Sequence, residues 1–204
     1  MSTQEFTALL LFATAMSFTP GPNTTLSTAL AANHGLRRSL HFIVAVPTGW
    51  TLMMLACGLG LGGLILAMPL LRLAVKVFGI GYLVWMAWKL SFAGTLAEAS
   101  RDRLQVSFAQ GVAMQFVNIK AWMLAIALAG GWVASSGGQP VANPGERLAI
   151  VCAVMLGFAL TSNLTYAIAG ALLRQWLAQG ARLLWFNRVM AALLLATACW
   201  MVVA

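Results

Sequence analysis

Long apolar blocks follow one another along the chain, and polar residues interrupt them at only a few places. Six blocks are each long enough, at about 20 residues, to cross the hydrocarbon core of a bilayer as a helix. They extend over Phe6–Ala32, Leu40–Leu61, Leu70–Leu90, Phe108–Val133, Leu148–Leu172 and Leu183–Val203. The stretch Ser135–Gly145, rich in Gly, Ser and Pro, is the clearest loop outside the membrane. The pattern predicts an all-α membrane protein with six transmembrane helices.

Composition supports the membrane assignment. Of 204 residues, 61% are hydrophobic and 8% are charged, whereas about a quarter of the residues of a soluble protein are charged. The connections between the blocks are short, so we expect one integral membrane domain over residues 1–204. The net charge of +8 comes from basic residues at the block ends rather than in a patch interleaved with aromatics. This distribution is typical of membrane orientation and argues against nucleic-acid binding.

The distribution of Lys and Arg predicts the orientation of the chain. The first, third and fifth connections with their flanks hold Arg37, Arg38, Lys89, Arg101, Arg103, Arg174 and Arg182. The second and fourth hold Arg72, Lys76 and Arg147. Because cytoplasmic loops carry the excess of basic residues, both termini are predicted to lie outside the cytoplasm. Trp50 and five other tryptophans lie near predicted span ends, so we expect their rings at the membrane interface.

The six spans divide into two groups of three, over about residues 1–95 and 104–204. Because each group crosses the membrane an odd number of times, the second has the opposite orientation to the first. This is the arrangement of a 3+3 inverted repeat, which is common among transporters. The first span of each half carries a polar interruption, TPGPN (Thr19–Asn23) in one and QFVNIK (Gln115–Lys120) in the other. We therefore expect the first and fourth helices to be broken.

The two prolines of TPGPN, Pro20 and Pro22, lack an N–H and clash with the carbonyl four residues earlier. They are expected to release the carbonyls of Met16 and Phe18. Free carbonyls in hydrocarbon cost several kcal/mol each, so the break should face protein or a water-filled cavity.

Gly21 followed by Pro22 fits an N-cap and first position of a restarted helix. The first N–H groups of that helix, around Asn23 and Thr24, would then point into the break at a positive dipole end. A substrate carboxylate would find donors there, and a substrate ammonium would find the released carbonyls. The alternative is a kink without a binding role.

In the second interruption Lys120 places an ammonium well inside a span, where a charge costs at least about 2.5 kcal/mol. It is either a counter-ion for a carboxylate or a proton carrier, or else a structural cation paired with carbonyls. Asn118 either caps a half-helix or bonds a neighbouring helix. A third polar group lies in the fifth span, where helix-to-helix bonding is the alternative role, and we select two of its residues, Asn163 and Tyr166, as candidates for lining a pathway.

The acidic residues narrow the chemistry. Glu5, Glu98, Asp102 and Glu146 all lie at or beyond predicted span ends. No carboxylate is thus available within the membrane to hold a metal, carry a proton or pair a cationic side chain. Zinc-binding, nucleotide-binding and nucleophile motifs are also missing, so we expect neither an enzyme nor a cofactor or metal.

With these motifs in view, the chain resembles the lysine exporter / homoserine-threonine resistance (LysE/RhtB) family of bacterial amino-acid exporters. The resemblance covers nearly the whole chain. Its most specific elements are TPGPN, HGLRRSLHFIVAVPTG (His34–Gly49), FGIGYLVWMAWKL (Phe78–Leu90) and FAQGVAMQFVNIKAW (Phe108–Trp122). Ser39 and Ala45 replace glycines usual in the family. Ile119 replaces its usual proline, which puts the second break in question.

The resemblance implies export of small amino acids from the cytoplasm, driven by the proton-motive force, at a bacterial inner membrane. The FVNIK variant is most similar to the cysteine/O-acetylserine exporter subgroup. Because no carboxylate lies within the membrane, a neutral amino acid (cysteine/O-acetylserine-like or threonine/homoserine-like) is a better substrate than lysine.

The predicted partners are this substrate, protons and membrane lipid, and the small-residue faces permit a homodimer. The predicted substrate-binding residues are Pro20, Gly21, Pro22, Asn23, Thr24, Asn118, Lys120, Asn163 and Tyr166. Two alternatives remain open: an uncoupled channel for small polar solutes, and a membrane scaffold subunit without transport.

Overall fold

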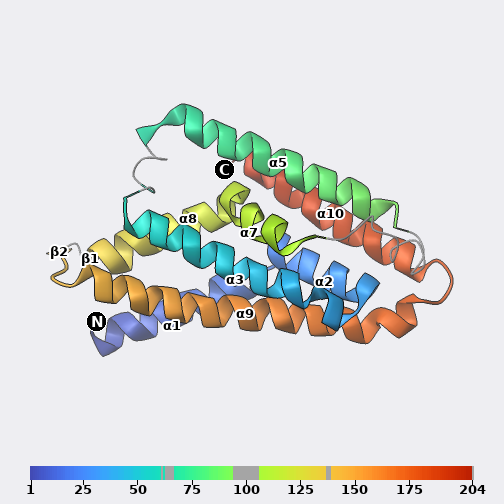
Figure 1. The fold of residues 1–204 in the computed structure, drawn as a ribbon, viewed down its shortest axis with the longest axis horizontal. Coiled ribbons are helices and arrows are strands. Elements are labelled where there is room, and N and C mark those ends of the chain that lie inside the picture. Colours follow the sequence, from blue (N-terminus) through green and yellow to red (C-terminus); the bar gives the residue numbers. More distant parts are fainter. Residues whose placement is uncertain (61, 63–66, 94–105, 137–138, 204) are drawn as a thin grey trace.

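The computed structural model describes residues 1–60, 62, 67–93, 106–136 and 139–203. These residues are almost entirely helical (Figure 1). The elements in chain order are α1 (Thr3–Phe18), α2 (Pro22–His34), α3 (Leu36–Gly58), α5 (Pro69–Ser91), α7 (Phe108–Val117), α8 (Ile119–Leu128), a π-helical turn η2 (Ala129–Ala134), β1 (Ser135–Ser136), β2 (Gln139–Pro140), α9 (Pro144–Leu177) and α10 (Arg182–Val203). The two short strands pair antiparallel within the loop predicted at Ser135–Gly145.

Four of these helices, α3, α5, α9 and α10, are long and apolar enough to cross a membrane. The bent pair formed by α7 with α8 and η2 meets the same criteria as a fifth span. The prediction of an all-α membrane protein is therefore confirmed. The α1–α2 segment is divided and does not qualify among these spans, so six spans in a 3+3 repeat stay a prediction.

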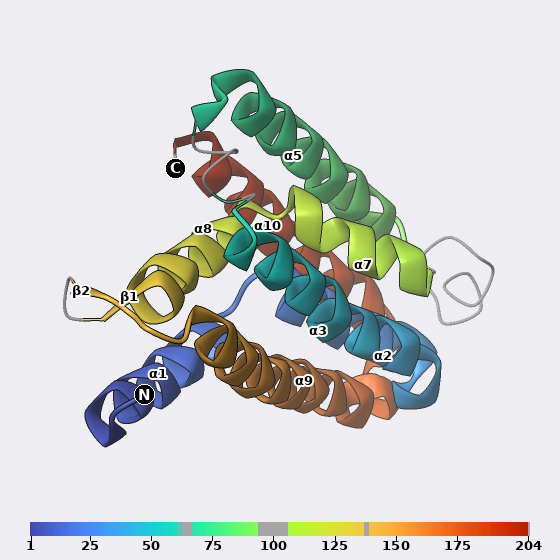
Figure 2. The same cartoon turned by 60° about the vertical axis from the view of Figure 1, so that its left-hand side comes forward.

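The helices run roughly along the long axis of the molecule (Figure 1). Helix α5 packs beside α10, and α3 beside α9, while α2 packs on both α9 and α10. The two chain ends and the β1–β2 hairpin lie on the same half of the molecule in both ribbon views (Figure 2). The turn from α2 to α3 and the turn from α9 to α10 lie on the opposite half.

Glycines set the distance between several helices. A Cβ on Gly170 of α9 would overlap the backbone oxygen of Thr28 in α2, and one on Gly79 of α5 would overlap the oxygen of Val117 in α7. A Cβ on Gly49 of α3 would lie 2.7 Å from the oxygen of Val112 in α7. These helices are therefore in backbone contact, as small residues allow in membrane helix packing.

A buried polar cluster joins α2, α10 and the residues that directly follow α5. The side-chain amides of Asn33 and Asn187 exchange two hydrogen bonds of 2.8 and 3.0 Å, and Asn187 Nδ2 also donates to the carbonyl of Ala93 at 2.8 Å. Both asparagines are fully buried. Apolar surfaces alone allow a helix to rotate about its own axis. The hydrogen-bonded pair therefore fixes the rotation of α2 and α10 relative to each other.

We expect Asn187→Leu to lower stability by about 1–3 kcal/mol, because it leaves the Asn33 amide and the Ala93 carbonyl buried with fewer partners. The thermal unfolding midpoint of the purified protein in detergent measures this effect. The double variant Asn33→Leu/Asn187→Leu should lose less than the sum of the two single variants. Strict additivity would show that the two amides are not coupled.

Candidate functional site

The first predicted break is present. Helix α1 ends at Phe18, the backbone is extended through Thr19 to Gly21, and α2 begins at Pro22. Thr24 Oγ1 accepts from the N–H of Gly21 at 3.0 Å, and the same hydroxyl lies 3.1 Å from the Gly21 carbonyl. The break therefore has a defined geometry at the start of α2, where helical geometry leaves the first N–H groups without intrahelical acceptors.

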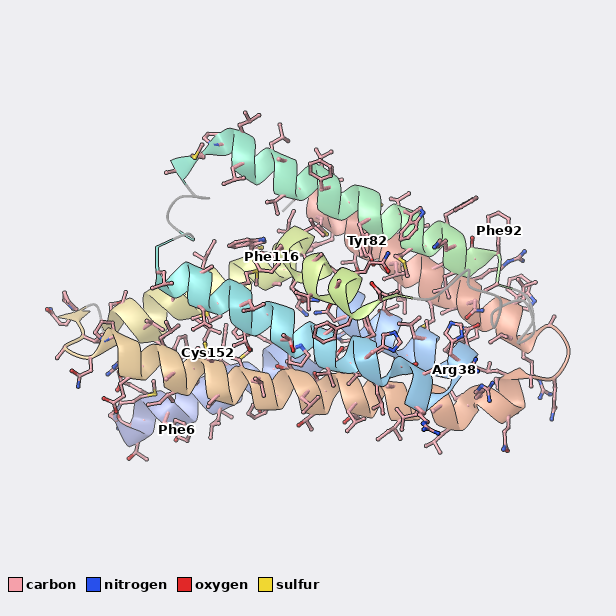
Figure 3. The ribbon with its side chains drawn as sticks, in the orientation of Figure 1. Phe6, Arg38, Tyr82, Phe92, Phe116 and Cys152 are labelled. Atoms are coloured by element: carbon pink, nitrogen blue, oxygen red, sulfur yellow. The ribbon has the colours of Figure 1, made fainter. Side chains whose placement is uncertain are left out.

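The second predicted break is also present, although Ile119 replaces the proline usual in the resembling family. Helix α7 ends at Val117, α8 begins at Ile119, and the two segments are bent by 68°. The indole of Trp122 donates to the carbonyl of Phe116 at 2.7 Å, and their rings meet edge to face at 6.3 Å between centroids. This contact satisfies one carbonyl of the last turn of α7, so the bend does not depend on proline. Figure 3 labels Phe116.

The two breaks lie against each other. Lys120 Nζ, in the first turn of α8, donates to the carbonyl of Thr19 at 3.2 Å. Tyr166 of α9 donates its hydroxyl to the carbonyl of Phe18 at 3.0 Å. The Phe18 carbonyl is one of the two that the prolines were expected to release. Polar side chains of α8 and α9 therefore bond the two carbonyls at the end of α1.

Two further side-chain pairs fix α2 against the second half of the chain. Asn23 and Gln115 exchange amide hydrogen bonds of 2.9 and 3.1 Å. Ser27 donates to Asn163 Oδ1 at 2.9 Å, and Asn163 Nδ2 donates to the carbonyl of Ala159. The amides of Asn23 and Asn163 are thus engaged within the protein in this conformation.

A cavity lies where these elements meet, with an empty volume of about 540 Å³ that includes space open to the outside. Its lining comprises Met16, Ser17, Thr19, Gly21, Pro22, Asn23, Thr24, Val46, Trp50, Asn118, Lys120, Ala121, Leu124, Met155, Ala159, Ser162 and Asn163. Seven of the nine residues predicted as substrate-binding are among them: Gly21, Pro22, Asn23, Thr24, Asn118, Lys120 and Asn163. Pro20 and Tyr166 are not in this lining, although Tyr166 bonds the adjacent Phe18 carbonyl.

Among the described residues that line the cavity, only Lys120 has a charged, titratable side chain. The described part of the chain contains no group of three His, Cys, Asp or Glu residues that could hold a metal. The cavity therefore offers one cation together with amides, hydroxyls and backbone carbonyls. These groups can bind a carboxylate and an ammonium.

Trp50 is the residue that sequence reasoning placed wrongly. Its ring was expected at the membrane interface, but Trp50 is 4% exposed and lines the cavity. The signal was available, since position 50 falls in the middle of the predicted span Leu40–Leu61. The position within the span should have outweighed the general preference of indole rings for interfaces.

The fold and the cavity define a multi-pass membrane protein with a polar site where two helix breaks meet. The profile of the LysE type translocator family matches residues 14–204. The chain belongs to that family.

Two relatives align with most or all of the chain. It is 29% identical over 204 residues, the full length of both proteins, to a cysteine/O-acetylserine efflux protein of Klebsiella pneumoniae subsp. pneumoniae. It is also 29% identical over 178 residues, 87% of each chain, to a cysteine/O-acetylserine efflux protein of Escherichia coli. No solved structure matches the chain significantly.

Proposed function

We propose that the protein exports small neutral amino acids or their derivatives across the bacterial inner membrane in exchange for protons. The observation that carries this proposal is the meeting of both helix breaks at one cavity, which the Lys120–Thr19 bond connects. Family membership and the efflux relatives support the direction and the substrate class.

The polar groups of the cavity match a zwitterion. The substrate carboxylate binds Lys120 Nζ and the N-terminus of α2, where a positive dipole end faces the break. The amide oxygen of Asn118 is buried and has no hydrogen-bond partner among the described residues, and its side chain does not cap α8. This oxygen accepts from the substrate ammonium.

Binding would exchange one hydrogen bond for another. In the structure Lys120 Nζ donates to the Thr19 carbonyl. When a carboxylate takes over Lys120, the Thr19 carbonyl becomes free to accept from the substrate ammonium. The new hydrogen bond from the substrate ammonium to the Thr19 carbonyl would therefore offset the free energy lost when the Lys120–Thr19 bond breaks.

Proton exchange needs a titratable group at the site. Lys120 is the titratable side chain in the described cavity lining. Because only the ammonium form of Lys120 can hold the substrate carboxylate, we expect substrate binding at this site to depend on pH.

Alternating access follows from the two-half plan. In an inverted repeat, α3 of the first half would correspond to α9 of the second, and α5 would correspond to α10. The two members of each pair pack against each other. We propose a 3+3 inverted repeat in which one helix group rocks against the other around the cavity. The turns from α2 to α3 and from α9 to α10, on the half of the molecule where Figure 3 labels Arg38, face the cytoplasm, and both termini face the periplasm.

Flux in proteoliposomes tests the proposal. Labelled cysteine, O-acetylserine, threonine and lysine are followed with and without a pH gradient. We expect gradient-dependent movement of at least one neutral amino acid and little movement of lysine, because the described cavity lining holds no carboxylate for a second ammonium. Flux that ignores the gradient would indicate a channel instead, and no flux of any of them would contradict the proposal.

A further inference from the structure

Two residues of the cavity lining carry a buried polar atom that lacks a hydrogen-bond partner among the described residues: Asn118 with its Oδ1 and Trp50 with its Nε1. The first has been assigned to the substrate ammonium. The indole N–H is a donor only, and leaving such a donor buried without an acceptor costs free energy. A ligand that supplies an acceptor would remove that cost.

Trp50 belongs to the apolar wall of the cavity. It packs in one cluster with Leu124 and Met155, and Met16 lies against the same cluster. The charged and amide groups that suit a zwitterion come instead from the two helix breaks. A bound amino acid whose head is held at the breaks therefore directs its side chain toward the wall that contains Trp50.

The position of Trp50 is held rigidly. The preceding residue, Gly49, lies so close to α7 that an added Cβ would be 2.7 Å from the Val112 oxygen and 2.9 Å from Cγ of Gln115. Gln115 is itself fully buried and paired with Asn23. A donor on a helix packed this tightly is preorganised, which favours discrimination between ligands.

We propose that Trp50 determines side-chain specificity by donating its indole N–H to an oxygen or sulfur acceptor on a short substrate side chain. The inference rests on the proposed function, because it concerns the substrate of the same cavity. The exporter then favours amino acids with a hydroxyl, thiol or ester group over aliphatic amino acids of the same shape. An aliphatic side chain fills the same space but leaves the indole donor buried and unpaired.

Threonine and valine make the sharpest test, since they have the same shape and differ by a hydroxyl in place of a methyl. Transport of each is measured in proteoliposomes for the wild type, for Trp50→Phe and for Trp132→Phe. The wild type should prefer threonine by about tenfold, the value of one neutral hydrogen bond. Trp50→Phe keeps an aromatic ring without the N–H and should bring the ratio close to one.

Trp132→Phe is the matched control. Its indole N–H is already bonded to the Glu5 carbonyl and Trp132 is not in the described cavity lining. Any loss of activity in this variant should affect threonine and valine equally and leave their ratio unchanged.

Equal wild-type transport of threonine and valine, or a preference for threonine that survives in Trp50→Phe, would overturn the role of Trp50 while leaving export intact. The wild-type ratio gives a result even where Trp50→Phe fails to fold. Absence of flux for every amino acid would overturn both the role of Trp50 and the proposed function.

Discussion

Replacing Lys120 by methionine is expected to lower amino-acid flux by about a hundredfold or more. The change removes the ammonium that we assign to the substrate carboxylate, and a carboxylate left without a cation in a protected site loses several kcal/mol of binding. Methionine has a similar length and a high helix propensity, so α8 should form normally. The Thr19 carbonyl loses its donor but remains at a cavity that is partly open to the outside.

Lys76→Met provides the matched control for this experiment. Lys76 also donates its ammonium to a backbone carbonyl, that of Val202 at 2.7 Å, but it lies in α5 and is not in the described cavity lining. Flux should stay near the wild-type rate in this variant. Initial rates in proteoliposomes are compared after the amount of folded protein has been matched by size-exclusion chromatography. Full activity of Lys120→Met would remove Lys120 from the mechanism, leaving it the structural role of a cation bonded to Thr19.

The helix breaks were predictable because their causes are local. Pro20 and Pro22 cannot continue a helix, and Gly21 followed by Pro22 starts a new one. The second break was less certain from the sequence, since Ile119 does not stop a helix. The bond from the Trp122 indole to the Phe116 carbonyl spans this break, but the spacing of the two residues does not by itself reveal that they are bonded.

The partners of the polar residues were much harder to predict than their positions. Asn23 and Gln115 both stood in the predicted interruptions, but nothing in their spacing shows that their amides pair across 92 positions. Asn33 and Asn187 went unnoticed, because single asparagines near helix ends are ordinary residues for caps and loops. Glycine contacts are equally non-local: Gly81 has nothing within 4 Å of an added Cβ, whereas Gly170 lies directly on a neighbouring backbone.

Gly170→Ala is expected to have the largest effect on folding. The added methyl group would overlap the Thr28 carbonyl oxygen, and the Cα of Thr28 would lie only 3.1 Å away. These are backbone atoms of α2 and cannot rotate aside, so the two helices must separate. We expect destabilisation of about 3 kcal/mol or more, at the upper end of what overpacking costs, and a large loss of folded protein.

Gly157→Ala is the control, because Gly157 lies in the same helix and has nothing within 4 Å of an added Cβ. Alanine has the higher helix propensity, so this variant should be as stable as the wild type or slightly more stable. The two unfolding midpoints, measured in the same detergent, separate the effect of the α2–α9 contact from the effect of alanine itself. Similar midpoints would show that α2 can move away from α9 at little cost. That result would also contradict a fixed geometry of the cavity, because the hydrogen bond between Ser27 and Asn163 joins the same two helices.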